Sequence, residues 1–277
     1  MKLLEKLRTE KESDLHGGIY HKLQVDFAYN SNHIEGSRLT HDQTRYIYET
    51  NSIGIGIDKS EQAVNVNDII ETINHFRCLD LILDTVDETI NESYIKQLHS
   101  TLKSGIVDKH AVIGEFKKEN NFVGDITTAA PQEVGNQIKK LLSEFNQFNM
   151  ALYDIAQFHM QYEKIHPFYD GNGRTGRLIM FKQCLQNNIL PFVIDDKDKL
   201  FYYMGLKEWQ KENKSERLLN VFLAAQDNMA ATLDYFGIEY SRSTTTYREE
   251  LDLHKQRIMQ RSRAIIAPRK SSGLGRK

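Results

Sequence analysis

The chain has 277 residues, of which 40% are hydrophobic and 27% are charged, and its formal net charge at pH 7 is −2. This length allows one large domain with appendages, and the composition is that of an ordinary globular protein. The balanced charge excludes a uniformly basic nucleic-acid-binding chain, and no segment has the unbroken apolar length of a membrane span.

The cysteines and the N-terminus indicate a reducing compartment. Cys78 and Cys184 both lie in apolar helical contexts, with no spacing that suggests a disulfide framework or a metal site. The first residues include lysines and glutamates where a secretory signal would need an apolar run. We therefore expect a cytoplasmic protein with two reduced, buried cysteines and no membrane partner.

Apolar residues at helical spacing predict a mainly α fold, and only four prolines interrupt the chain. In chain order, helices are predicted over residues 2–14, 23–35, 40–50, 60–84, 91–104, 131–148, 152–166, 198–212, 216–236 and 246–263, with one more after residue 172. Residues 51–58 predict a loop or a short strand, and the end after residue 263 is expected to be disordered. We divide the chain into an N-terminal helical segment (1–58), a core (59–212) and C-terminal helices with a basic tail (213–277).

Residues 112–123 are the one stretch that resists a helical interpretation. Val112, Ile113 and Phe116 precede a polar Lys-Lys-Glu-Asn-Asn centre, and Phe122 and Val123 follow it. Two short apolar arms around five turn residues predict a β-hairpin that protrudes from the helical bundle.

The most unusual stretch runs from His166 to Arg177 and reads His-Pro-Phe-Tyr-Asp-Gly-Asn-Gly-Arg-Thr-Gly-Arg. Pro167 ends the preceding helix, and Asn172 or Gly173 is expected to cap the next one. The glycines allow positive φ and let backbone N–H groups converge on one point. The stretch therefore predicts an anion-binding nest at a helix N-terminus.

Charged side chains in the same stretch indicate which anion binds. Arg174 and Arg177, at i and i+3 in the first turn of the new helix, oppose the positive end of the helix dipole unless they bind a polyanion. Both could donate hydrogen bonds to one phosphate chain. Asp170 is an oxygen ligand suited to Mg²⁺ shared with substrate phosphates, and His166 is the expected base near neutral pH.

These residues match the motif His-Pro-Phe-x-(Asp/Glu)-Gly-Asn-Gly-Arg-x-x-Arg, so the chain resembles Fic (filamentation induced by cAMP) domain proteins over about residues 60–210. The resemblance implies a helical bundle in which the motif joins two helices and a hairpin, the flap, lies beside it. The residues similar to the family's flap pattern, which would dock an extended target segment, include Gly114, Phe116, Lys117 and Val123. Lys117 stands where many relatives carry arginine.

A second motif lies near the N-terminus, where Ser31, Glu35 and Gly36 form part of Ser-Asn-His-Ile-Glu-Gly. Taken alone, it predicts only the glycine-capped last turn of a short helix. It resembles the family's inhibitory motif, (Ser/Thr)-x-x-x-Glu-(Gly/Asn), in the class with an N-terminal inhibitory helix. The resemblance implies that Glu35 pairs with Arg177 and competes with ATP for this arginine.

The resemblance also implies a protein adenylyltransferase (AMPylase), which moves AMP from ATP to a Ser, Thr or Tyr hydroxyl of a target protein or of itself. His166 would accept the hydroxyl proton, and Asp170 would hold Mg²⁺. The phosphates would be bound by Gly171, Asn172, Gly173, Arg174 and Arg177. A target protein is the expected partner, and self-modification and a homo-oligomer are left open.

Two alternatives stay open. Removal of AMP, with Glu35 orienting a water, is implied by the resemblance for some members with such a glutamate. The tail from Arg242 to Lys277, with ten Lys/Arg against three Asp/Glu, could instead contact nucleic acid. Aromatic residues are sparse in this tail, so a solvated helix with a frayed end is favoured.

Four other residues are not expected to be ligands: His159 and Trp209 are expected to pack, and His33 and His41 show no sign of a zinc site. His159 and Trp209 lie in apolar helical contexts. His33 and His41 lack the carboxylate cluster or the spacing of a zinc site.

Overall fold

The computed structural model describes residues 2–52, 64–106, 112–124, 126–145 and 150–266, with the side chains of residues 260–266 excepted. Within these residues the chain forms eleven α-helices, one 3-10 helix and one two-stranded sheet. The predicted mainly α fold with a β-hairpin is therefore confirmed.

The helices follow the predicted order, with changes at several ends. The first half contains α1 (Lys2–Glu12), α2 (Ile19–Ile34), α3 (His41–Thr50), α4 (Val66–Asp84) and α5 (Glu92–Lys103). The second half contains β1 (Phe122–Val123), β2 (Ile126–Thr127), α6 (Pro131–Phe145), α7 (Leu152–Ile165), α8 (Asn172–Gln186), η1 (Asp196–Asp198), α9 (Lys199–Glu212), α10 (Glu216–Tyr235) and α11 (Tyr247–Ile266). Helix α2 begins before the predicted residue 23, and α4 begins after the predicted residue 60. Residues 53–58 of the predicted loop and the end after residue 266 lie outside the described residues.

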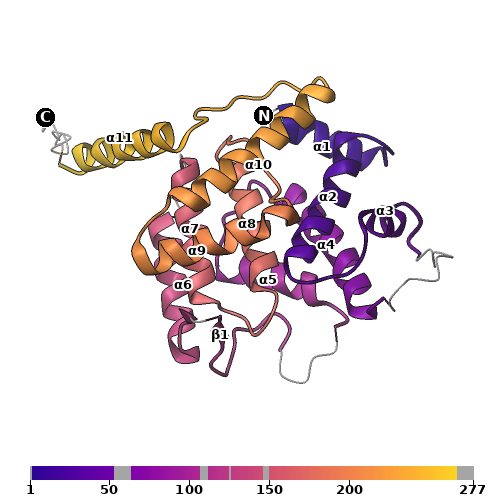
Figure 1. Cartoon of the computed structure of the whole chain (residues 1–277), viewed down its shortest axis with the longest axis horizontal. Helices are drawn as coiled ribbons and strands as arrows, with labels where there is room; N and C mark the ends of the chain where they lie inside the picture. Colours follow the sequence, from indigo (N-terminus) through magenta and orange to yellow (C-terminus); the bar gives the residue numbers. More distant parts are fainter. Residues whose placement is uncertain (1, 53–63, 107–111, 125, 146–149, 267–277) are drawn as a thin grey trace, which may run out of the picture.

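Helix α8 lies at the centre of the bundle (Figure 1) and packs against α7, α5, α4 and α2. Its apolar spacing predicts one buried face, but every residue from Arg174 to Leu185 is buried. Buried polar groups need partners, and Lys182 accordingly donates to the Thr85 carbonyl oxygen. The helix that carries both motif arginines is therefore surrounded on all sides.

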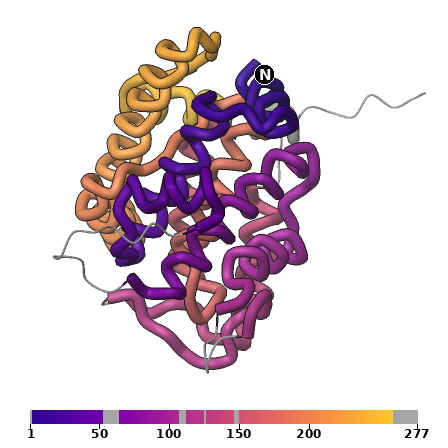
Figure 2. The backbone as a smooth tube through the Cα atoms, turned by 90° about the vertical axis from the view of Figure 1, so that its right-hand side faces the viewer, coloured from indigo at the N-terminus to yellow at the C-terminus, as the bar shows by residue number. Residues whose placement is uncertain are grey.

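The N-terminal helices cover one side of α8. Helix α2 packs against α1, α3 and α4, and Figure 2 shows these indigo and purple helices together on the near side. On another side α9 packs closely on α10, because a Cβ on Gly205 would lie 2.7 Å from the Leu218 backbone nitrogen. This arrangement places the end of α2 beside the first turn of α8.

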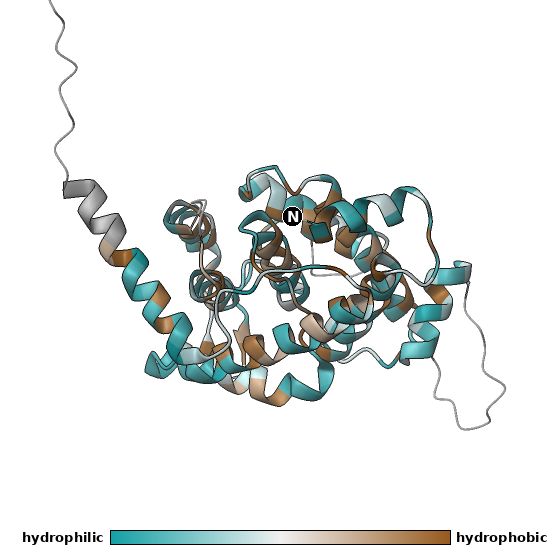
Figure 3. Ribbon diagram, turned by 90° about the horizontal axis from the view of Figure 1, so that it is seen from above, coloured by the Kyte–Doolittle hydropathy of each residue, from teal (hydrophilic) through white to brown (hydrophobic). Residues whose placement is uncertain are grey.

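Helix α11 extends away from the rest of the bundle (Figures 1 and 3). Its first turns contact α7: His254 Nδ1 lies 3.1 Å from Asp154 Oδ1, and buried Glu250 accepts a hydrogen bond of 2.7 Å from the Tyr153 backbone nitrogen. The start of the predicted basic tail is therefore fixed to the bundle. Nucleic-acid binding by this tail stays an open prediction.

The hairpin lies further along the chain than predicted. Phe122 of β1 pairs with Thr127 of β2, and Val123 pairs with Ile126. Gly124, with φ 58°, lies between the two strands and supplies the positive φ that such turns need. The first arm predicted at residues 112–116 was therefore wrong.

The hairpin was misplaced for a physical reason that lies at Lys117, which was predicted to be in the turn between the two arms. Its side chain is buried, and Nζ donates to Asn121 Oδ1 at 2.6 Å and to Thr128 Oγ1 at 2.7 Å. Its backbone nitrogen donates to the Pro167 carbonyl oxygen at 2.9 Å. The polar centre thus anchors the hairpin to the bundle instead of forming its tip.

Candidate active site

The motif loop joins the C-terminal end of α7 to the N-terminus of α8, as predicted. His166 ends α7 in the left-handed conformation, with φ 53°, and Gly171, with φ 78°, is the N-cap residue of α8. The predicted caps, Asn172 and Gly173, were therefore wrong. Asn172 instead closes the loop, because Oδ1 accepts from the Phe168 backbone nitrogen at 2.8 Å and Nδ2 donates to the Phe168 carbonyl oxygen at 2.9 Å.

Arg177 is buried inside the bundle, and its partners come from α2. Nε donates to Ser31 Oγ at 3.0 Å, and Nη2 donates to the Ser31 carbonyl oxygen at 2.9 Å and to Glu35 Oε1 at 2.8 Å. Burial lowers the pKa of Arg177, but Glu35, Tyr202 and Tyr203 together outweigh burial and hold the pKa above its ordinary value. The predicted contact between Glu35 and Arg177 is present, and its inhibitory effect stays a prediction.

The end of α2 fixes the position of Glu35. Gly36, with φ 101°, donates to the His33 carbonyl oxygen at 3.0 Å, and the Ser37 backbone nitrogen donates to the Asn32 carbonyl oxygen at 3.0 Å. This pair of bonds is the Schellman helix end that glycine after Glu35 predicts. The Glu35 side chain is therefore held at the end of a regular helix.

The Glu35 carboxylate lies against the first turn of α8. A Cβ on Gly173 would lie 2.2 Å from Glu35 Oε1 and 3.0 Å from Arg177 Nη1, so this close approach requires glycine. Among the described residues, Arg177 Nη1 has no hydrogen-bond partner. Glu35 thus places a negative charge at a helix N-terminus, where anions are favoured.

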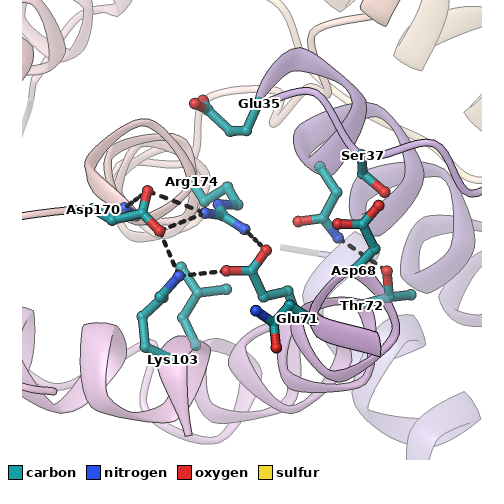
Figure 4. Close-up of polar contacts among 12 residues, drawn as sticks. Glu35, Ser37, Asp68, Glu71, Thr72, Lys103, Asp170 and Arg174 are labelled. Carbon is teal, nitrogen blue, oxygen red and sulfur yellow. Dashed lines mark hydrogen bonds and ion pairs between the residues drawn. The ribbon is translucent and has the colours of Figure 1, made fainter. Parts of the chain in front are cut away.

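Four charged side chains form a closed group beside the motif loop, here called the charge cluster: Glu71 of α4, Lys103 of α5, Asp170 and Arg174 (Figure 4). Lys103 Nζ lies 2.5 Å from Asp170 Oδ2 and also bonds to Glu71. Arg174 pairs with Glu71, and its Nη2 lies 3.5 Å from Asp170 Oδ1. Each carboxylate therefore contacts both cations. Glu71 and Lys103 could not be predicted from the sequence, since single charges on helices give no signal.

Asp170 is ionised near neutral pH. Burial raises its pKa, but Arg174 and Lys103 outweigh burial and lower the pKa to about 2. The described residues contain no group of three or more His, Cys, Asp or Glu that could hold a metal. A single carboxylate fits Mg²⁺ that takes its other ligands from substrate phosphates and water. The donor set therefore fits the predicted ion in combination with a nucleotide.

His166 is a neutral imidazole near pH 7. Burial, followed by the charge of Lys117, lowers the pKa of His166 to about 4. Among the described residues, its Nδ1 has no hydrogen-bond partner. A neutral imidazole can accept a proton, so His166 has the protonation state of a general base.

His99 joins the segment before the hairpin to the motif loop. Its ring is stacked on Phe168, with centroids 3.7 Å apart and an angle of 4° between the planes. Nδ1 accepts from the Gly114 backbone nitrogen at 3.1 Å, so Nε2 carries the hydrogen and donates to the Asp170 carbonyl oxygen at 3.0 Å. His99 could not be predicted from the sequence as part of the site, because its partners are distant in the chain.

Comparison with known proteins fits this geometry. Residues 89–184 match the profile described as the Fic/DOC family. This segment of the chain, which includes the motif loop, is therefore similar to Fic/DOC domains. Two relatives are each named "Protein adenylyltransferase Fic". The one from Nematostella vectensis is 27% identical over 247 residues, which cover 81% of this chain and 53% of the relative. The one from Drosophila willistoni is 29% identical over 192 residues, which cover 65% of this chain and 35% of the relative. The chain thus spans about a third to a half of these relatives.

Solved structures share the Fic fold. A Fic domain containing signaling protein from Bacteroides thetaiotaomicron superposes with a TM-score of 0.66 at 21% identity, covering 87% of this chain and 99% of that chain. A Fic family protein from Desulfovibrio desulfuricans G20 gives a TM-score of 0.65 at 19% identity, covering 87% of this chain and 74% of that chain. At these identities the likeness establishes the fold alone.

The predicted Fic flap residues differ in their surroundings. The backbone nitrogens of Gly114 and Lys117 donate to His99 and to the Pro167 carbonyl oxygen. Phe116 lies partly buried against Phe168, with ring centroids 5.5 Å apart. Val123 is exposed on β1. Docking of a target by these residues stays a prediction.

Residues behind the Fic motif pack as expected. His159 is buried, with Nε2 2.7 Å from the Tyr202 hydroxyl oxygen, and Trp209 is buried beside Tyr153. Burial raises the pKa of Glu163 to about 8, although Arg177 lowers it.

The remaining sequence predictions concern cysteines, histidines and membrane spans. Cys78 and Cys184 are buried free thiols, as predicted. His33 and His41 pair with Asp196 and Asp26. Within the described part of the chain, no helix has the length and apolar character that crossing a membrane requires.

Proposed function

We propose that the chain is a protein adenylyltransferase that transfers AMP from ATP to a hydroxyl side chain of a target protein, and that Glu35 restrains this activity. The relatives named above carry the name of this activity. The observation that carries the proposal is the motif loop with the start of α8, where a neutral His166, an ionised Asp170, two buried arginines and a glycine-rich backbone lie together. Positioning and charge neutralisation are what such a transfer requires.

The residues of the loop have separate tasks in the proposed reaction. His166 accepts the proton of the target hydroxyl while the hydroxyl oxygen attacks the α-phosphorus of ATP. A bond forms between these two atoms, the bond from the α-phosphorus to the oxygen that bridges to the β-phosphate breaks, and pyrophosphate leaves. The backbone N–H groups of Asn172 and Gly173 and the arginines Arg174 and Arg177 neutralise the phosphates. A divalent metal held by Asp170 would supply further neutralisation.

The proposed inhibition follows from the hydrogen bonds of Arg177. Two of its nitrogens donate to Ser31 and Glu35, so they are not available to a phosphate. Glu35 Oε1 also lies within 2.2 Å of where a Cβ on Gly173 would be, which is the surface that a phosphate would approach. Glu35 and a nucleotide phosphate would therefore compete for the same arginine and the same space.

A second candidate is removal of AMP from a modified target. The observation that favours it is the position of the Glu35 carboxylate at the first turn of α8, where it could orient a water towards a phosphorus atom. In that reaction water attacks the α-phosphorus, and the target hydroxyl leaves with a proton.

The test is intact-mass analysis of candidate targets, and of the protein itself, after incubation with ATP and Mg²⁺. Wild type, Glu35→Gly and His166→Ala are compared, with circular dichroism as a check on folding. We expect addition of AMP to be greatest with Glu35→Gly and lost with His166→Ala. Labelling that does not need His166 would contradict the proposal. Wild type that removes AMP from a modified target faster than it adds AMP would favour the second candidate.

A further inference from the structure

Lys103 is a buried cation placed directly on the motif carboxylate. It is the last residue of α5, and its side chain is only 4% exposed. Its Nζ lies 2.5 Å from Asp170 Oδ2 and also bonds to Glu71 (Figure 4). Its stem packs beneath the loop, since a Cβ on Gly171 would lie 3.4 Å from Lys103 Cδ. Lysine is rarely this buried unless it is paired, so the ammonium is part of the built site.

The charge cluster is balanced before any metal binds. The two carboxylates, Glu71 and Asp170, each contact the two cations, Lys103 and Arg174. The other Asp170 oxygen, Oδ1, accepts a hydrogen bond from the Gly171 backbone nitrogen at 2.6 Å. Both carboxylate oxygens therefore already have a donor.

A divalent metal and the Lys103 ammonium would repel each other if both contacted Asp170 Oδ2. Mg²⁺ binds oxygen at roughly 2.0–2.1 Å, so a metal on Asp170 Oδ2 would lie within about 5 Å of an ammonium that stayed on the same atom. Like charges at this separation repel, most strongly where water is excluded. Lys103 therefore has to leave Asp170 before the metal is bound well.

Glu71 offers the place to which Lys103 can withdraw. Glu71 already bonds to Lys103, and its side chain is 13% exposed, so the pair stays largely shielded from solvent. A lysine is a point charge on a flexible stem, and a rotation near its end can release one partner while the other is kept. The withdrawal thus leaves neither Lys103 nor Glu71 without a partner.

We propose that the Lys103 ammonium occupies the site on Asp170 Oδ2 where a divalent metal would bind. The metal binds there only when Lys103 breaks its contact with Asp170 and keeps its contact with Glu71. This inference rests on the proposed function, which brings the nucleotide and the metal to Asp170. Lys103 then sets the metal concentration at which the site fills, and Glu71 lowers that concentration by receiving the lysine.

The test measures Mn²⁺ binding directly, by electron paramagnetic resonance of the free ion, with the full chain in the presence and absence of a non-hydrolysable ATP analogue. Lys103→Met is expected to bind Mn²⁺ about tenfold more tightly than wild type. Glu71→Gln is expected to bind it more weakly, because Lys103 then has Asp170 as its only carboxylate. Lys182→Met is the matched control, since Lys182 is a buried lysine that bonds to Thr85 instead.

The opposite signs of the two variants separate this role from a general loosening of the site, which would move both in one direction. An Mn²⁺ affinity of Lys103→Met equal to or below that of wild type would overturn the proposal, as would tighter binding by Glu71→Gln. Thermal unfolding by circular dichroism confirms that each variant is folded. If the affinities shift as expected but no AMP is transferred to any target, the proposed function fails while the role of Lys103 stands.

Discussion

Replacing Glu35 with glutamine tests whether charge or bulk keeps Arg177 from a nucleotide. Glutamine has nearly the same shape, so it still fills the space above Gly173 but carries no charge. A hydrogen bond to a charged group contributes about 1.5–3 kcal/mol, whereas one between neutral groups contributes about 1 kcal/mol. Glu35 is 29% exposed, so the lower part of the first range, about 1.5–2 kcal/mol, applies.

These energies predict a graded release of activity. Glu35→Gly loses the whole contact, and since 1.4 kcal/mol is a factor of ten, AMP transfer should rise about 10- to 30-fold. Glu35→Gln keeps a hydrogen bond to the charged guanidinium but loses the charge–charge attraction, about 0.5–1 kcal/mol for a partly exposed ion pair, and should give a rise of about 2- to 5-fold. The free energy of unfolding should fall in the same order, because buried Arg177 loses its counter-charge.

The assay follows transfer from α-labelled ATP under single-turnover conditions, with chemical denaturation of the same samples. A glutamine variant as inactive as wild type, beside an active glycine variant, would show that bulk is responsible and refute the electrostatic argument. Equal transfer by all three proteins would remove the inhibitory role of Glu35 altogether.

Three further predictions concern the buried side chains of His166 and Glu163 and the close packing at Gly205. With a pKa of about 4, His166 stays neutral down to mildly acidic pH. The rate of AMP transfer by Glu35→Gly should therefore fall only as pH drops well below 6.5, and a midpoint near 6.5 in the pH–rate profile would contradict this. Because burial raises the pKa of Glu163 to about 8, its contribution to stability is fully present below its ordinary value near 4.5 and is lost as pH rises through 8. Denaturation between pH 5 and 8 should therefore show wild type losing stability relative to Glu163→Gln, by at most about 1.4 kcal/mol per pH unit, and parallel curves would argue against the raised pKa. Gly205→Ala should cost about 1–3 kcal/mol of unfolding free energy, since its Cβ would lie 2.7 Å from the Leu218 backbone nitrogen, and an unchanged melting temperature would show that α9 and α10 can separate freely.

Local signals in the sequence predicted the ends of several helices correctly. Thr40 forms a capping box with Gln43 at the start of α3, and Gly36 ends the segment at Glu35. Such signals act over three or four residues, so a single sequence contains them. The hairpin was misplaced because Lys117 meets its partners only in the folded protein. Its Nζ donates to Thr128 Oγ1, and its backbone nitrogen donates to the Pro167 carbonyl oxygen.

In the candidate site, too, some residues were predicted from the sequence and others were not. The groups of the motif loop, including His166 and Arg177, were predicted together because they are contiguous in the chain. Their partners Glu71, Lys103 and His99 were not predicted, since each is a single polar residue on a helix that packs against the loop. Only the order in which α4, α5 and α8 pack brings these residues together.

The burial of α8 on every side bears on how fast the protein could switch. A helix enclosed by its neighbours is fixed in position, so the backbone that carries Gly173 and Arg177 has little room to rearrange. Glu35 is the more exposed member of its pair, at 29% against 2% for Arg177. Rotation of a partly exposed side chain takes picoseconds to nanoseconds, whereas collective motion of helices takes microseconds to milliseconds. The proposed exchange of Glu35 for a phosphate would thus need only the faster class of motion.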